Sequence, residues 1–209
     1  MERIMDEIDL RGWSVIVGGI ESPLAQAAQR AGATALMELS VTDVDILNQV
    51  DARAVQFAEE RAAEMVGMKF VGDRLVENPN PRWAITDSTR EMLREEVTRG
   101  VKEGFSTDKI ARQIEESYAF SKDRAKVISQ TEIARAHVHG NIEGWKASGV
   151  VSGKRSILAS NHDQDDECDG NADIGEVDLE ELFPSGDMAP PYHPNCFCDV
   201  VAVLAEEGK

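Results

Sequence analysis

The residues best suited to chemistry are three cysteines and a histidine close to the C-terminus, namely Cys168, His193, Cys196 and Cys198. Thiolate and imidazole are preferred ligands of Zn²⁺, and a structural zinc site takes four of them in a tetrahedron. In an extended segment Cys196 and Cys198 point to the same face, because side chains alternate along a strand. The sequence therefore predicts a structural Cys₃His zinc site, with Asp165 and His162 as reserve ligands.

Two other interpretations of this region stay open. An odd number of cysteines does not fit a disulfide framework, so the first alternative is three reduced, partly buried thiols. The second is calcium, because the segment from Asp165 to Glu176 places acidic residues at the first, third, fifth and twelfth positions of a calcium loop. Gly170 occupies the sixth position, but Glu167 stands where Asp or Asn is usual. Calcium is therefore the alternative metal.

The thiol-rich set argues against catalysis. A catalytic zinc keeps one position open and is held mostly by histidine and carboxylate, whereas three thiolates and a histidine close the site. The chain contains no His-Glu-x-x-His, Gly-x-Ser-x-Gly or phosphate-loop motif. We therefore expect no enzymatic activity. The alternatives are a zinc-dependent hydrolase that uses His162 or Glu167, and a calcium-binding interaction module.

The charge and hydropathy of the sequence limit the classes of partner that the protein is expected to bind. The 209 residues carry a formal net charge of -17, and the segment from Arg155 to Lys209 holds 14 acidic and 2 basic residues, which gives -12. Such an acidic region argues against sequence-specific DNA recognition. Residues 82–135 are nearly balanced, so non-specific DNA contact stays open. No apolar run approaches the ~20 residues of a membrane span, and the acidic start lacks a signal-peptide pattern, so we expect a protein made in a cytoplasm, without a membrane partner.

The helices and strands that must position these residues can be predicted from the spacing of apolar residues and from the residues that end a helix. Helical periodicity predicts helices over about 23–39, 51–66, 88–104, 106–117 and 121–148, with Asp51 and Ser88 as caps. The Pro-containing segment 72–81 is expected to be a loop. Short strands are expected at 150–151, 156–158 and 199–204. The prediction is an α+β fold: a mostly helical body followed by a small β-containing C-terminal module that a metal could stabilise. Its regions are 1–80, 81–149 and 150–209.

Two blocks of uncommon residues carry a resemblance to a known family. The first block contains Arg124-Ala125, Ile128, Thr131-Glu132, Asn141, Gly144-Trp145, Ser148-Gly149 and Gly153-Lys154-Arg155. The second contains Cys168, Asn171, Gly175, Phe183-Pro184-Ser185-Gly186, Pro190-Pro191, His193-Pro194-Asn195-Cys196 and Cys198. In order and spacing these residues resemble the phage Mu protein F-like family of minor head proteins, also called head morphogenesis proteins, from about Asp51 to Val203.

The resemblance implies a structural minor capsid protein of a tailed bacteriophage, present in few copies in the head interior or at the portal vertex and assembled in the host cytoplasm. Its implied partners are the portal, major capsid and scaffolding proteins, and some relatives influence DNA packaging or ejection. The chain departs from the family at two places. Family members often carry Cys-x-x-Cys where this chain has Asp165-Asp166-Glu167-Cys168, so Asp165 or His193 would complete the ligand set. The usual Arg between the last two cysteines is Phe197.

The first block also suggests a structural ion-pair network. Arg124 and Glu132 are eight residues apart and so lie roughly on one face of the expected helix, and Glu132 forms an i,i+3 pair with Arg135. We expect these charges to fix the helix against the β module. The alternative is ordinary solvated charge on a helix surface.

Overall fold

The computed structural model describes residues 11–72, 74–82, 84–162 and 166–205, and the chain forms two units. Within the described residues, unit 1 comprises 11–22 and 59–126, and unit 2 comprises 23–58 and 127–205. Long helices are combined with one two-stranded and one three-stranded antiparallel sheet, so the predicted α+β class is confirmed. None of the helices in the described ranges is long and apolar enough to cross a bilayer.

Unit 1 contains the start of α2 (Arg11–Glu38) and the end of α3 (Val44–Met65). After α3 it continues with β1 (Met68–Val71), β2 (Arg74–Glu77), α4 (Ile85–Lys102), α5 (Thr107–Glu115) and η1 (Tyr118–Phe120). The expected loop over 72–81 is partly wrong, because residues 74–77 form the second strand of the β1–β2 pair. The expected cap at Ser88 is also wrong: α4 starts three residues earlier, and the Ser88 hydroxyl donates to the carbonyls of Ala84 and Ile85 inside the helix.

Three long helices build the helical part of unit 2, which takes most of α2 (Arg11–Glu38), α3 (Val44–Met65) and α6 (Lys122–Ser148). Helix α2 extends upstream of Pro23, where the sequence predicted its start. The cap of α3 is Asp43 rather than Asp51, since the Asp43 carboxylate accepts from the amides of Asp45 and Ile46.

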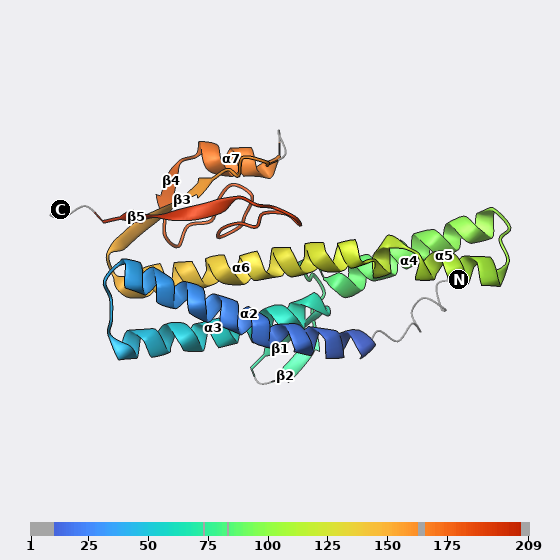
Figure 1. Cartoon of the computed structure of the whole chain (residues 1–209), viewed down its shortest axis with the longest axis horizontal. Helices are drawn as coiled ribbons and strands as arrows, with labels where there is room; N and C mark the ends of the chain where they lie inside the picture. The colour runs from blue at the N-terminus through green and yellow to red at the C-terminus, as the bar shows by residue number, and fades with distance from the viewer. Residues whose placement is uncertain (1–10, 73, 83, 163–165, 206–209) are drawn as a thin grey trace. The chain divides into compact units, whose positions relative to one another are not determined.

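Helices α2 and α6 approach each other closely within unit 2 (Figure 1). A Cβ at Gly140 would overlap the carbonyl oxygen of Ala28, and one at Gly144 would lie 2.8 Å from the carbonyl oxygen of Gly32. Glycine is therefore required at this crossing, because any side chain would push the two helices apart. Helix α3 adds a stacked Phe57–His139 ring pair against α6, with ring centroids 4.2 Å apart.

The C-terminal part of unit 2 is a three-stranded sheet with the order β4-β3-β5. Its strands are β3 (Val151–Ile157), β4 (Glu176–Asp178) and β5 (Asp199–Leu204). Strand β3 is one continuous strand, where the sequence predicted two, and it pairs antiparallel with both neighbours. The strand predicted at 199–204 is confirmed.

The core of unit 2 joins this sheet to α6. Val151, Val177 and Val200 of the sheet cluster with Val138, Ile142 and Trp145 of α6, and all are buried. In Figure 1 the sheet lies along the C-terminal half of α6, and the short helix α7 (Glu167–Asp173) lies beyond the strands as seen from α6. Helix α7 was not expected from the sequence. It occupies part of the long segment between β3 and β5 that was predicted to be a loop.

Candidate metal centre

Cys168 is positioned by the first turn of α7. Asp166 is the N-cap of this helix, and its Oδ1 accepts from the backbone amide of Cys168 at 2.7 Å. The reciprocal hydrogen bond runs from the amide of Asp166 to Oδ2 of Asp169 at 3.3 Å, and the two bonds form a capping box. The cap fixes the start of α7, and the Cys168 side chain is fully buried.

His193 and Cys196 come from the loop that precedes β5. The amide of Cys196 donates to the carbonyl of His193 at 3.2 Å, which closes a turn between the two residues. Asn195, inside that turn, has a φ of 65°, a left-handed conformation that Asn tolerates better than most residues. Its amide donates to the hydroxyl of Thr131 on α6 at 3.0 Å. The turn is therefore fixed to α6 by a buried hydroxyl.

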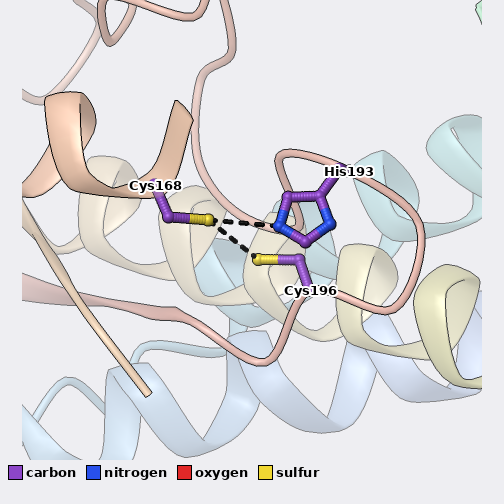
Figure 2. A group of neighbouring side chains, drawn as sticks. All are labelled: Cys168, His193 and Cys196. Carbon is purple, nitrogen blue, oxygen red and sulfur yellow. Dashed lines mark hydrogen bonds between the residues drawn. The ribbon is translucent and has the colours of Figure 1, made fainter. Parts of the chain in front are cut away.

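Three donor atoms meet in this place, as Figure 2 shows. The ligand atoms of Cys168, His193 and Cys196 all lie within 4.8 Å of one another. The two sulfurs are 3.6 Å apart, and Cys168 Sγ is 3.3 Å from His193 Nε2. Tetrahedral zinc with Zn–S bonds of about 2.3 Å places two sulfurs about 3.8 Å apart, and a sulfur and a nitrogen about 3.6 Å apart. The donors therefore fit zinc to within a few tenths of an ångström.

The orientation of His193 also fits a metal ligand. Its Nδ1 lies 3.0 Å from the carbonyl oxygen of Pro194, to which it can only donate. With Nδ1 as donor in that bond, Nε2 is the ring nitrogen that faces Cys168 and is placed to bind a metal. Metal-binding histidines characteristically hold their second nitrogen in this way, which fixes the tautomer and the ring orientation.

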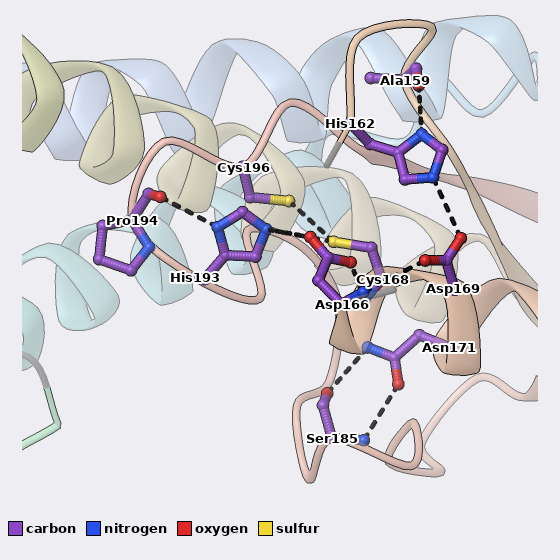
Figure 3. Close-up of polar contacts among 10 residues, drawn as sticks. All are labelled: Ala159, His162, Asp166, Cys168, Asp169, Asn171, Ser185, His193, Pro194 and Cys196. Atoms are coloured by element: carbon purple, nitrogen blue, oxygen red, sulfur yellow. Dashed lines mark hydrogen bonds and ion pairs between the residues drawn. The ribbon is translucent and has the colours of Figure 1, made fainter. Parts of the chain in front are cut away.

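Two further groups lie next to the three donors. The thiol of Cys198 is close enough to that of Cys168 to raise its pKa, although Cys198 is not one of the three donors that lie within 4.8 Å of one another. The Oδ2 atom of Asp166 lies 3.2 Å from His193 Nε2, as Figure 3 shows. Cys198 was predicted as a ligand, whereas Asp166 was not singled out. Asp165, the predicted reserve, lies outside the described residues.

His162, the other reserve ligand, has different partners (Figure 3). Its Nδ1 lies 2.9 Å from the carbonyl oxygen of Ala159, and its Nε2 lies 3.0 Å from Oδ1 of Asp169. The bond to Ala159 and the carboxylate of Asp169 raise its pKa. Because the same carboxyl group completes the capping box of α7, His162 supports the helix that carries Cys168.

The pKa values of the Cys168 and Cys198 thiols are shifted in the direction expected without a neighbouring positive charge. Burial raises the pKa of Cys168, and the neighbouring Cys196 thiol raises it further. Burial also raises the pKa of Cys198. Two or three thiolates in one apolar pocket repel one another, so protonated thiols are favoured. A divalent cation reverses this preference, and its binding must therefore release protons.

The calcium interpretation does not have the required geometry. A calcium loop wraps its carboxylates around one centre, but Glu167–Asp173 forms helix α7 and Glu176 begins strand β4. Glu167 and Glu176 are exposed. The spacing of acidic residues that suggested calcium is therefore explained by a capped helix.

Lys154 is a site-supporting residue that sequence reasoning missed. It lies on β3 with its side chain fully buried, and its Nζ donates to the carbonyls of Leu179 at 2.7 Å and Glu181 at 2.6 Å. Nζ also lies 2.9 Å from the sulfur of Met188. Burial lowers the pKa of Lys154 to about 8. The signal in the sequence was a pair of adjacent cations, Lys154 and Arg155, since alternation along a strand places one of them on the buried face.

The amide side chain of Asn171 holds the same loop from α7. Its Nδ2 donates to the hydroxyl of Ser185 at 2.9 Å, and its Oδ1 accepts from the amide of Ser185 at 3.0 Å (Figure 3). The Ser185 hydroxyl in turn donates to Asp187 at 2.9 Å. Asn171 is fully buried, so these bonds satisfy a polar group that would otherwise be costly to bury.

Arg124 and Glu132 contact different elements. In unit 1, Arg124 donates to the hydroxyls of Thr89 and Ser88 at 2.9 and 2.8 Å, and to the carbonyl of Ala119 at 2.8 Å. Burial lowers the pKa of Arg124. In unit 2, the expected pair of Glu132 with Arg135 is present at 3.7 Å. Arg124 therefore joins α4 to η1 and the start of α6.

A family model described as Phage Mu protein F like protein matches residues 91–201. No curated protein and no solved structure matches the chain. The matched segment is more than half of the 209 residues and includes Arg124, Glu132 and all four predicted zinc ligands. The same segment also contains the buried Gly140 and Gly144 of α6, the capped Cys168 and the turn from His193 to Cys196. The chain therefore belongs to the family of phage Mu protein F like proteins.

Proposed function

We propose that this protein is a structural minor head protein of a tailed bacteriophage, which acts in head morphogenesis at the portal vertex. The family match over residues 91–201 is the observation that carries the proposal. In this role the protein contacts the portal protein and the neighbouring capsid and scaffolding proteins inside the virion. Contact with packaged DNA, during packaging or ejection, would be non-specific, because the C-terminal region is strongly acidic.

The metal centre, in this proposal, is structural. Cys168, His193, Cys196 and Cys198 bind one Zn²⁺, which joins helix α7 to the loop before β5. The donor distances and the orientation of His193 support Cys168, His193 and Cys196, and the neighbouring thiol of Cys198 is proposed as the fourth ligand. A set of three thiolates and one histidine is typical of structural zinc and leaves no position for substrate or water, so we propose no catalytic role.

Elemental analysis of the purified full chain tests the metal. We expect one zinc per chain, and a His193→Asn variant that loses zinc and melts at a lower temperature. His137→Asn is the matched control, since His137 is exposed on α6 and is not part of the donor cluster. A wild-type protein that contains no zinc, together with a His193→Asn variant of unchanged melting curve, would contradict the structural zinc.

Assembly is tested separately. We expect the chain to sediment with procapsids that contain the portal when it is expressed with the head proteins of its phage. Procapsids that assemble without the portal should retain much less of it. Absence of the chain from purified heads would refute the head-protein assignment without affecting the zinc result.

A further inference from the structure

The two edges of the C-terminal sheet differ in their protection. Strand β4 is three residues long and carries exposed Glu176 and Asp178. Short, charged edge strands are the usual protection against pairing with another chain. Strand β5 is six residues long, and after Asp199 it contains only Val, Ala and Leu. Its Val201, Ala202 and Val203 are half-buried, and within the described residues β3 is its only strand partner.

An apolar groove lies next to the start of β5. Its volume is about 620 Å³, and it is lined by α6 on one side and by residues 195–199 on the other. Ile133, Ala134 and Val138 contribute from α6, and Phe197 from the loop. Phe197 is 49% exposed and Ile133 39% exposed, so large apolar side chains of this groove face solvent. Asp199 belongs both to the groove and to β5, so groove and edge form one continuous surface.

The charge of the C-terminal segment, which supplies β5 and one side of the groove, indicates the partner. Between Arg155 and Lys209 the sequence contains no Lys or Arg but 14 acidic residues. A second copy of this chain would bring acidic residues against acidic residues, whereas a basic segment would be attracted. Two cations lie on β3. The ammonium of Lys154 is buried and already bonded to carbonyls, and the exposed Arg155 is opposite Glu176 of β4 in the sheet register.

We propose that β5 and the groove bind an extended, basic segment of a partner protein by strand addition. The backbone of the segment pairs with the outer edge of β5, and one apolar side chain enters the groove between Ile133 and Phe197. Main-chain hydrogen bonds give affinity in this mode of recognition, and pockets for alternate side chains give specificity. The surface does not depend on the assignment to a phage head.

The test uses the full chain and a fluorescent seven-residue peptide, acetyl-Lys-Val-Lys-Leu-Lys-Val-Lys-amide, which places its apolar residues on one face of a strand. Anisotropy titration should show binding at least tenfold tighter than for a peptide with Glu in place of Lys. It should also be tenfold tighter than for a peptide with Pro in place of both Val, which keeps the charge but cannot pair. Amide hydrogen exchange in residues 199–204 should slow when the first peptide binds.

Two protein variants locate the peptide. Ala134→Trp fills the groove without a change of charge and should weaken binding at least tenfold. Ala111→Trp, on the exposed surface of α5, should leave binding unchanged. Equal binding of the Pro-containing peptide, or binding without slower exchange in β5, would overturn strand addition. A dimer of the chain alone, with β5 already protected, would overturn it in favour of a second copy.

Discussion

The substitution Lys154→Met tests the contribution of the buried ammonium group separately from that of the aliphatic part of the side chain. Methionine keeps the length and the apolar stem of lysine but cannot donate hydrogen bonds. In the structure the ammonium holds the carbonyls of Leu179 and Glu181 at 2.7 and 2.6 Å. These carbonyls belong to the long segment between β4 and β5, which also carries His193 and Cys196. The substitution therefore releases the first part of this segment from β3.

The magnitude follows from two opposing contributions. A buried acceptor left without a partner costs about 1–3 kcal/mol, so two carbonyls cost about 2–6 kcal/mol. Removing a buried charge offsets part of this loss, because burial of the ammonium is unfavourable, as its pKa of about 8 indicates. We expect a net loss of about 2–3 kcal/mol at pH 7. For a chain of this size that is a fall in Tm of roughly 5–10 °C.

Urea unfolding followed by circular dichroism, at a fixed zinc concentration, measures the change. Arg155→Met is the matched control, because Arg155 is the next residue on the same strand and is exposed. We expect that control to stay within about 0.5 kcal/mol of the wild type. If Lys154→Met is equally stable, the bonds to the two carbonyls contribute nothing and the reasoning fails.

The pH dependence gives a second check. The pKa of Lys154 is about 8 in the folded chain and near its ordinary value of 10.5 in the unfolded chain. Between these values the unfolded state binds the proton more strongly, so the free energy of unfolding gains a contribution that rises with pH. This contribution is absent from Lys154→Met. The stability difference between wild type and variant should therefore widen from pH 8 to pH 10.5, and a constant difference would refute the lowered pKa.

Three further predictions concern other parts of the chain. Gly140→Ala should destabilise unit 2 by about 3 kcal/mol in urea unfolding, because its Cβ would overlap the Ala28 carbonyl. The control is Gly170→Ala, whose Cβ would have no atom within 4 Å and which should cost less than about 0.5 kcal/mol. Arg124→Met should destabilise the chain by about 3 kcal/mol, since it leaves buried hydroxyl and carbonyl acceptors unpaired; Arg90→Met, at an exposed position on α4, is its control. Zinc affinity, measured by competition with a chelator, should rise about tenfold per pH unit for each proton released between pH 6 and 8, because burial raises the pKa of the thiols; a pH-independent affinity would show that no thiol is protonated before binding.

The sequence predicted the helices well and the caps poorly. Apolar spacing located the bodies of the long helices, although the C-terminal half of α6 is buried on more than one face. It placed the start of α3 at Asp51 and of α4 at Ser88, although a helix can run through a capping residue when upstream residues already satisfy its amides. Asp43 performs this role for α3. The candidate cap at Ser88 instead forms bonds inside α4, which only the structure can show.

The candidate site was predictable in its ligands and not in its surroundings. Clustered cysteine and histidine residues are typical of metal sites, so Cys168, His193 and Cys196 were identified from their types alone. Helix α7 was missed because seven residues are too few for a periodic pattern, and its acidic residues matched a calcium loop equally well. Lys154 and Asn171 were missed as loop-holding residues because their partners are mostly backbone groups, which no sequence pattern encodes.

The segment between β4 and β5 shows why these surroundings matter. It is about twenty residues long, contains no strand or helix, and is longer than most connections in compact domains. Lys154 fixes its first part from β3, Asn171 fixes its middle from α7, and Thr131 fixes its end from α6. Each contact uses a buried polar group, and each comes from a different element. A metal at Cys168, His193 and Cys196 adds a cross-link only to the end of this segment. Removal of the metal should therefore loosen residues 193–198 and leave the contacts of Lys154 and Asn171 in place.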